Sequence, residues 1–111
     1  MTYQNTHIYR RALELVSTSK QVIDALPKGY AFLADQLRRA ATSVVLNFAE
    51  GHDKGSRTEQ RRYFRIARGS AQEVGAILDV AERFGAIDPA LHAVGQDLSD
   101  HLVRMLYRFR R

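Results

Sequence analysis

The sequence predicts an all-α protein, an antiparallel four-helix bundle whose helices run up, down, up and down. Apolar residues recur three and four positions apart along four separate segments, which is the spacing of one helix face. No segment shows the sustained alternation of apolar and polar residues between turn residues that is typical of a strand. The expected connections are short, and short connections make neighbouring helices antiparallel. Residues 1–111 are therefore expected to form a single four-helix bundle domain.

The first helix is expected from about Thr6 to Leu26. Pro27 ends it, because proline disfavours helical backbone in the residue before it, and Gly29 lets the chain reverse. The apolar face of this helix consists of Ile8, Ala12, Leu15 with Val16, Ser19, Val22 with Ile23, and Leu26.

The second helix is expected from about Tyr30 to Glu50. Gly51 is expected to end it as a left-handed C-terminal cap, a conformation that glycine adopts without steric strain. The apolar face of this helix consists of Leu33, Leu37, Ala40 with Ala41, Val44 and Phe48.

The third helix is expected to begin with a capping box at Ser56. The serine oxygen accepts a backbone N–H, while the Glu59 side chain reaches back to the Ser56 N–H. Gly85 ends the helix, whose roughly 28 residues reach about 42 Å at ~1.5 Å per residue. Its apolar face consists of Tyr63, Ala67, Ser70, Val74, Ile77 with Leu78, Ala81 and Phe84.

The fourth helix is expected to begin at Asp88, an N-cap, with Pro89 at the first helical position, where its missing N–H is not needed. Its apolar face consists of Leu91, Val94, Leu98, Leu102, Met105 and Phe109. The residues expected to be buried in the core include Leu37, Val44, Ile77, Leu98 and Leu102. Three further apolar residues lie off these faces and favour self-association, which would cover them: Phe32, Leu46 and Leu106.

Composition indicates a globular protein and excludes several kinds of site. Hydrophobic residues make up 45% of the chain and charged residues 26%, and there is no cysteine to form a disulfide or a thiolate. No signal-peptide-like core is present at the N-terminus, and no apolar run approaches the ~18–20 residues of a membrane span. We therefore expect a soluble, cytoplasmic protein.

The sequence gives no support for an enzyme. None of the four histidines lies in an H-E-x-x-H arrangement or three or four residues from another, so no metal site is expected. A glycine-rich phosphate loop is also missing. Ser43, Ser56 and Ser70 have no histidine nearby in sequence, which leaves a triad assembled in space as an open alternative. No catalytic residue and no cofactor are predicted.

Arginines provide the strongest functional signal. The net charge is +5 and the isoelectric point is about 10, values that favour an acidic partner such as nucleic acid. Five arginines between residues 57 and 68 oppose one glutamate, whereas four acidic residues between positions 69 and 88 oppose one arginine. The chain's end adds four more arginines, of which Arg110 and Arg111 are the last two residues. The predicted nucleic-acid-binding residues are Arg57, Arg61, Arg62, Arg65, Arg68, Arg104 and Arg108.

Antiparallel packing would bring these arginines to one end of the bundle, together with Arg10 and Arg11. Guanidinium groups suit phosphate because they present a fixed fork of donors and stay charged. The aromatic residues interleaved with them, which could stack on unpaired bases, are Tyr9, Tyr63, Phe64 and Tyr107. Two alternatives remain: the aromatics belong to the core, as is expected for Tyr63, or the arginines pair with the acidic half of a neighbouring subunit.

A polar motif along the second and third helices consists of Gln36, Arg39, Asn47, Glu50, Gly51, Gly69, Ser70 and Glu73. With the hairpin turning around residues 53–54, Asn47 would lie level with Gln60 and Arg39 with Arg68. We expect Asn47 to cap backbone near the turn.

The same register predicts two ion pairs and one helix contact. Glu50 would bridge Arg57 or Arg61, and Glu73 would reach Arg39. Gly69 would let the third helix approach the second closely, together with Ala67, Ser70 and the Ala40–Ala41 pair. This motif is interpreted as structural rather than catalytic.

The chain resembles a known family through Gln36-Leu37-Arg38-Arg39-Ala40-Ala41, Ser43, Asn47-Phe48-Ala49-Glu50-Gly51, Ile66-Ala67-Arg68-Gly69-Ser70 and Glu73. The family comprises small four-helix-bundle proteins first noticed as open reading frames in intervening sequences of bacterial 23S ribosomal RNA genes. The resemblance implies a homo-oligomer, with a pentamer as the form of structurally studied relatives. A related branch contains accessory proteins of diversity-generating retroelements, but nothing in this sequence identifies a retroelement.

We therefore expect a non-enzymatic, basic, homo-oligomeric bundle that binds RNA or DNA through phosphate contacts. The alternative is a protein-interaction or assembly scaffold, with an unidentified protein partner and no nucleic-acid ligand. The salt dependence of any nucleic-acid affinity discriminates between the two.

Overall fold

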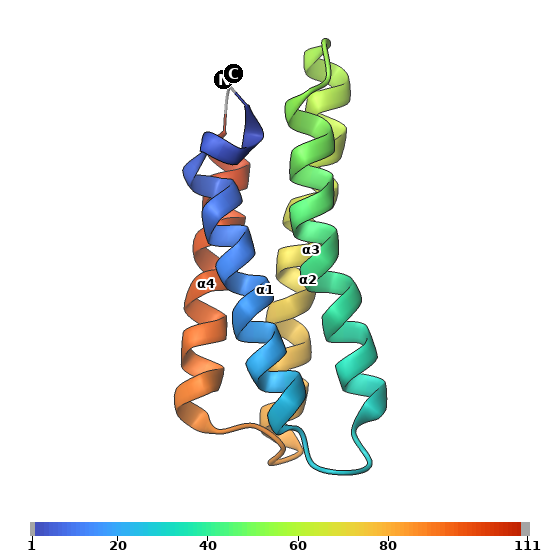
Figure 1. The fold of residues 1–111 in the computed structure, drawn as a ribbon, viewed down its shortest axis with the longest axis vertical. Coiled ribbons are helices and arrows are strands. Elements are labelled where there is room, and N and C mark those ends of the chain that lie inside the picture. The colour runs from blue at the N-terminus through green and yellow to red at the C-terminus, as the bar shows by residue number, and fades with distance from the viewer. Residues whose placement is uncertain (1, 110–111) are drawn as a thin grey trace.

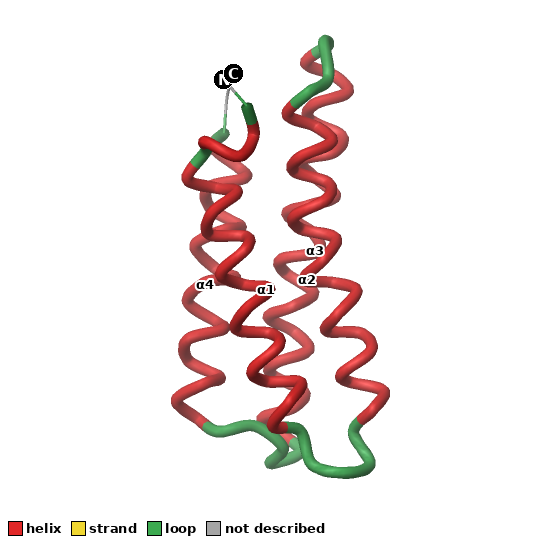
Figure 2. Tube along the Cα trace, in the orientation of Figure 1, coloured by secondary structure: helices red, strands yellow, loops and turns green. Residues whose placement is uncertain are grey.

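The computed structural model describes residues 2–109 and contains no strand within that range. Its helices are α1 (His7–Ala25), α2 (Ala31–His52), α3 (Arg57–Arg83) and α4 (Pro89–Arg108), preceded by the short 3₁₀ helix η1 (Tyr3–Asn5). Figures 1 and 2 show the helices side by side with short loops between them. The predicted all-α, four-helix fold is confirmed.

The helices form a ring in chain order. α1 packs against α2 and α4, and α3 packs against α2 and α4. The starts of α1 and α3 and the ends of α2 and α4 lie at the same end of the bundle, and the α2–α3 hairpin extends beyond the other two helices there (Figure 1). The described chain measures 45 × 22 × 19 Å, and none of its helices is long and apolar enough to cross a membrane.

Local capping explains where three of the helices begin. The side chains of Thr6, Ser56 and Asp88 accept hydrogen bonds from backbone N–H groups in the first turns of α1, α3 and α4. These bonds satisfy donors that have no partner within a helix. Gly29 and Gly85 adopt φ angles of 100° and 72°, in the left-handed region, where the chain leaves α1 and α3. The expected starts and reversals are confirmed at these positions.

The core lies along the axis of the bundle, and all five residues that we singled out as buried are buried: Leu37, Val44, Ile77, Leu98 and Leu102. The predicted face of α2 is buried at every position. Since each buried leucine or valine side chain contributes ~1.5–3 kcal/mol relative to an exposed one, this core is the main source of stability.

Three positions on the predicted apolar faces differ from expectation. Phe64, rather than Tyr63, is the buried aromatic at the start of α3, where it stacks on Phe48 with ring centroids 5.5 Å apart. Phe84 is 58% exposed because it lies past the last turn of α3. Val94 is 49% exposed, since the adjacent Gly95 is the residue that α4 places against α3.

Leu106, which was expected to need a subunit contact, is buried within the bundle at 4% exposure. Its position off the predicted face of α4 does not expose it, because α4 packs between α1 and α3 and buries a wide part of its surface.

Two glycines have roles opposite to those predicted. Gly51 does not form a left-handed cap; it lies within α2, where a Cβ atom would stand 2.7 Å from Tyr63 Cβ and 2.9 Å from the Phe64 ring. The helices α2 and α3 therefore touch at Gly51. Gly69 is not a close-approach residue, because it is exposed and a Cβ atom there would meet nothing within 4 Å.

The register of the α2–α3 hairpin also differs from the expected one. The Gln60 side-chain amide donates to the backbone oxygens of Lys54, at 3.0 Å, and His52, at 3.5 Å. Gln60 therefore lies level with the end of α2 and not with Asn47. Further along the hairpin, Ser70 and Ser43 share a hydrogen bond of 2.7 Å between their hydroxyl oxygens.

The predicted ion pairs across the hairpin are replaced by pairs within α2 and its loop. Glu50 pairs with Lys54 at 2.9 Å instead of Arg57 or Arg61, and Arg39 pairs with Asp35 at 2.9 Å instead of Glu73.

Asn47 does not cap backbone near the turn either. Its amide donates to the Ser43 carbonyl, at 2.9 Å, and to the Ser43 hydroxyl. Residues one turn apart on a helix are already neighbours, so these side chains form contacts within α2 rather than across to α3.

Candidate nucleic-acid interface

The predicted arginines gather where α3 begins and α4 ends. Two neighbouring hollows between these helices share Arg68 and Tyr107 as lining residues. One encloses about 260 Å³ and the other about 430 Å³. We call the combined feature the arginine groove, and its basic residues are Arg61, Arg65, Arg68, Arg104 and Arg108.

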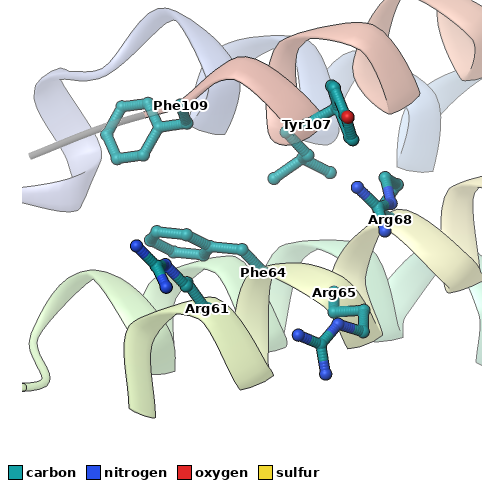
Figure 3. Close-up of a pocket in the computed structure, with 7 residues that line it drawn as sticks. Arg61, Phe64, Arg65, Arg68, Tyr107 and Phe109 are labelled. Carbon is teal, nitrogen blue, oxygen red and sulfur yellow. The ribbon is translucent and has the colours of Figure 1, made fainter. Parts of the chain in front are cut away.

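The first hollow has an apolar floor and a basic rim (Figure 3). Phe64 and Leu106 are buried, and Phe109 is half-buried, so they form the floor. Arg61 and Arg65 are exposed along the α3 side. The hollow therefore offers charge at its edge and an apolar surface beneath.

Arg68 and Tyr107 form the centre of the arginine groove. The Arg68 guanidinium carbon lies 5.1 Å from the centre of the Tyr107 ring, which is a cation–π arrangement. Figure 3 shows Arg68 reaching from α3 toward Tyr107 on α4. Arg68 is half-buried, whereas Tyr107 is 66% exposed. The contact fixes the orientation of the guanidinium while the tyrosine remains accessible.

The remaining arginines lie outside the groove. Arg62 covers the Tyr63 ring at 4.5 Å, and the ammonium group of Lys54 lies 5.3 Å from the same ring. Arg57 is exposed at the first residue of α3. Arg10 and Arg11 line a separate hollow between α1 and α4. Arg110 and Arg111 lie outside the described residues. The predicted single positive surface is thus a groove with basic flanks.

Ion pairs reduce the charge of several basic groups, among them Arg11, which pairs with Glu14 at 2.5 Å. Arg104 pairs with Asp100 one turn earlier on α4, which partly neutralises that side of the groove. The Glu50 carboxylate accepts a hydrogen bond from Lys54 and raises the pKa of that ammonium group. Glu50 therefore partly neutralises the positive charge of Lys54 in the α2–α3 loop.

Of the aromatic residues expected to stack on bases, Tyr107 alone is exposed in the arginine groove. Phe64 is a core residue and cannot stack on a base, because Phe48 and Phe109 cover it at centroid distances of 5.5 and 5.3 Å. Tyr9 is half-buried against Tyr3, with the ring centroids 5.0 Å apart.

The motif residues divide into two groups. Ser70 and Gly51 lie where α2 and α3 touch. Gln36, Arg39 and Glu73 are exposed, and an exposed side chain is not required for packing within one chain.

Sequence reasoning missed a cluster of metal-ligating side chains at the opposite end of α3. His92 on α4 lies 3.0 Å from an Asp79 oxygen and 3.6 Å from a Glu82 oxygen. The histidine contacts Gln96 one turn later, but no second histidine or carboxylate lies at helical spacing from it within α4, so a search within single helices does not find the cluster. The cluster could have been predicted from the short turn at Gly85, because that turn places Asp79 and Glu82 level with the start of α4.

Comparisons with known proteins give a family and a fold. The family described as 23S rRNA-intervening sequence protein matches residues 4–108. The chain is also similar to a crystal structure from Bacteroides thetaiotaomicron, described as a protein with unknown function from the S23 ribosomal protein family. The two sequences are 20% identical, and the match covers 89% of this chain and 94% of the other. The structures superpose with a TM-score of 0.82. At that identity the likeness shows the fold alone. No curated protein matches the chain.

Proposed function

The chain belongs to the 23S rRNA-intervening sequence protein family, and from that premise we propose that it is a non-enzymatic bundle that binds RNA or DNA through its arginine groove. The observation that supports this proposal is the convergence of five arginines from α3 and α4 on one hollowed surface. Arginine binds phosphate well because its planar fork of donors matches two phosphate oxygens and never loses its charge.

The groove suits a ligand that carries both phosphates and flat apolar groups. Exposed arginines along the rim would bind the backbone, and Tyr107 would contact a base or sugar between them. Contacts of this kind do not read base edges, so binding would show little sequence preference. A cytoplasmic location stays a prediction from the sequence.

We also propose that the protein forms a homo-oligomer. Two apolar residues support this, because Phe32 is 52% exposed and Leu46 is 61% exposed. Phe32 lies within 6.4 Å of Phe84 and 6.1 Å of Tyr30, measured between ring centroids, and so belongs to an exposed aromatic cluster. The pentamer implied by the resemblance is our expectation for the number of subunits.

The test of nucleic-acid binding is a fluorescence-anisotropy titration of single-stranded RNA and duplex DNA over a range of salt concentrations. Contacts from five arginines predict a log–log slope of about −4 to −5 for duplex DNA and about −3 to −4 for single strands. The double variant Arg61→Glu/Arg65→Glu should abolish binding, since both residues are exposed on the rim.

The matched control is Lys28→Glu/Arg83→Glu, which changes the net charge equally at exposed positions distant from the groove. It should retain most of the affinity. Circular dichroism and light scattering show whether each variant keeps its helicity and subunit number. If the parent has no affinity at low salt, or if the Arg61/Arg65 variant falls apart into monomers, the arginines serve assembly and the scaffold alternative is correct.

A further inference from the structure

Three metal-ligating side chains meet where α3 ends and α4 begins. Asp79 and Glu82 lie one turn apart on α3, and His92 lies in the first turns of α4. One ligand atom from each lies within 4.8 Å of the others. Ligand atoms of a tetrahedral zinc site are about 3.3 Å apart, given metal–ligand distances of ~2.0–2.1 Å. His92 Nε2 lies 3.0 Å from Asp79 Oδ1, close to that value, whereas the 3.6 Å contact of Glu82 Oε2 is with the other ring nitrogen, Nδ1.

Close packing of α3 and α4 brings these side chains together. At Gly95, a Cβ atom would overlap the Leu78 side chain, and at Gly75 it would stand 3.2 Å from the side-chain oxygen of Gln96. Both helices therefore have a glycine where they touch, one turn from the cluster. Ligands on two closely packed helices keep their spacing, which is what a metal site requires of its scaffold.

A fourth side chain, that of Gln96, orients Asp79 in the cluster. The Gln96 amide donates to Asp79 Oδ1 at 2.7 Å and to the Gly75 carbonyl at 2.8 Å. The His92 side chain is only 16% exposed, whereas Glu82 is 53% exposed. An ion bound between His92 and Asp79 would sit at the ring nitrogen Nε2, whereas Glu82 lies beside Nδ1. Glu82 would therefore have to turn toward Nε2, and its exposed side chain is free to do so.

We propose that Asp79, Glu82 and His92 bind a divalent transition-metal ion of the Zn²⁺ type. Two carboxylates beside a neutral imidazole carry two negative charges, which a dication balances. The set of one nitrogen and two oxygens suits Zn²⁺, Co²⁺ or Ni²⁺, whereas Mg²⁺ and Ca²⁺ prefer oxygen ligands in larger number. Water would complete the coordination, since both carboxylates face solvent.

Calorimetry with the full chain, without a histidine tag and after chelator treatment, tests the proposal. We expect one Zn²⁺ bound per chain, a Co²⁺ complex with visible absorption, and no comparable binding of Mg²⁺. His92→Gln and Asp79→Asn should each lower the Zn²⁺ affinity at least about tenfold, and Gln96→Ala, which acts through Asp79, by about 10- to 100-fold.

The matched control is His101→Gln. His101 is also half-buried on α4, but it accepts a hydrogen bond from Arg11 on the far side of the helix, so its loss should leave Zn²⁺ binding unchanged. The proposal is wrong if the parent shows no saturable Zn²⁺ binding, or if His92→Gln and Asp79→Asn bind as the parent does. If His92→Gln does not fold, the Zn²⁺ affinity of Asp79→Asn decides whether the proposal holds, because Asp79 is exposed and its substitution should not prevent folding.

Discussion

Gly51 and Gly69 show that the surroundings of a glycine decide whether a side chain can be added at its position. Gly51 lies against Tyr63 and Phe64, so the absence of a side chain lets α2 and α3 touch. Gly69 lies in the middle of α3 with open space around it. The two glycines therefore respond oppositely to the same added methyl group.

Gly51→Ala should destabilise the protein by ~1–3 kcal/mol, because Tyr63 Cβ is tied to the backbone and cannot move aside. Gly69→Ala should stabilise it by up to ~1 kcal/mol, since alanine is the better helix former. Urea unfolding followed by circular dichroism measures both changes. Effects of the same sign would show that the contact at Gly51 has been misjudged.

Arg68 differs from Arg65 because it stacks on Tyr107. Arg68→Lys keeps the charge but loses the planar group that the ring orients, so it should lower nucleic-acid affinity about 5- to 30-fold, as loss of a ~1–2 kcal/mol interaction implies. Arg65→Lys is the control and should have a smaller effect. Equal effects of the two substitutions in an anisotropy titration would mean that charge alone matters at Arg68.

At the scale of the element, α3 illustrates how a helix can be built from local signals and still contribute to two candidate sites. Its first half is basic and lines the arginine groove, while its last turns supply Asp79 and Glu82. Its start is fixed by the Ser56 side chain, which accepts a hydrogen bond from the Glu59 N–H at 3.1 Å. This cap fixes the residue at which α3 begins.

Ser56→Ala should destabilise the protein by ~0.5–2 kcal/mol, because the Glu59 N–H loses its acceptor. Thr58→Ala, exposed in the same first turn, should stay within ~0.5 kcal/mol of the parent. Thermal unfolding of both variants provides the comparison. A Ser56→Ala protein as stable as Thr58→Ala would show that the cap contributes nothing.

Two leucines of α4 provide a test of core packing. Leu102 has no exposed surface, whereas Leu98 lines the hollow between α1 and α4. Both should lose stability on truncation to alanine, within the ~2–5 kcal/mol of buried leucines, with Leu102→Ala the more severe because its site cannot relax into an existing hollow. Chemical denaturation checks the order, and the reverse order would contradict the assignment of the core's centre.

The elements could be predicted from the sequence wherever the signal is local. Ser56 and Asp88 cap helices as expected, since a cap depends only on the residues beside it. The predicted faces failed at Phe84, which lies past the last turn of α3, and at Val94, because the adjacent Gly95 is the residue that faces α3.

The candidate site was predictable only in part. Antiparallel packing brought the basic half of α3 to the end of α4, as expected from the order of the helices. Which arginines share a hollow depends on the rotation of each helix about its axis, and this left Arg57 and Arg62 outside the groove. The cluster around His92 depends on contact between two helices, which no pattern within one segment contains.

For the whole molecule, charge is separated along the length of the bundle. The arginine groove occupies one end, and Asp79, Glu82 and the exposed Phe32 and Phe84 belong to the other. The net charge of +5 therefore understates how basic one end is. A separation of this kind favours a fixed orientation of the bundle on a polyanion.

Self-association is the prediction at this scale. Light scattering at micromolar concentration should report a homo-oligomer, because Phe32 and Leu46 would otherwise remain exposed. Leu46→Glu should shift the equilibrium toward the monomer while helicity is kept, since this side chain contributes little to the core. A monomeric parent protein would refute the claim.

The ring-like order of the helices has a consequence for how fast the chain folds. Each helix packs against the helices next to it in the chain, and among the contacts between α-helices the α1–α4 contact alone joins two helices that do not follow one another in sequence. Such a low contact order places the folding time at about microseconds to milliseconds. Closing α1 onto α4 requires ordering of the long segment between them, so this contact should form last. Substitutions between α1 and α4 should therefore accelerate unfolding and leave the folding rate nearly unchanged.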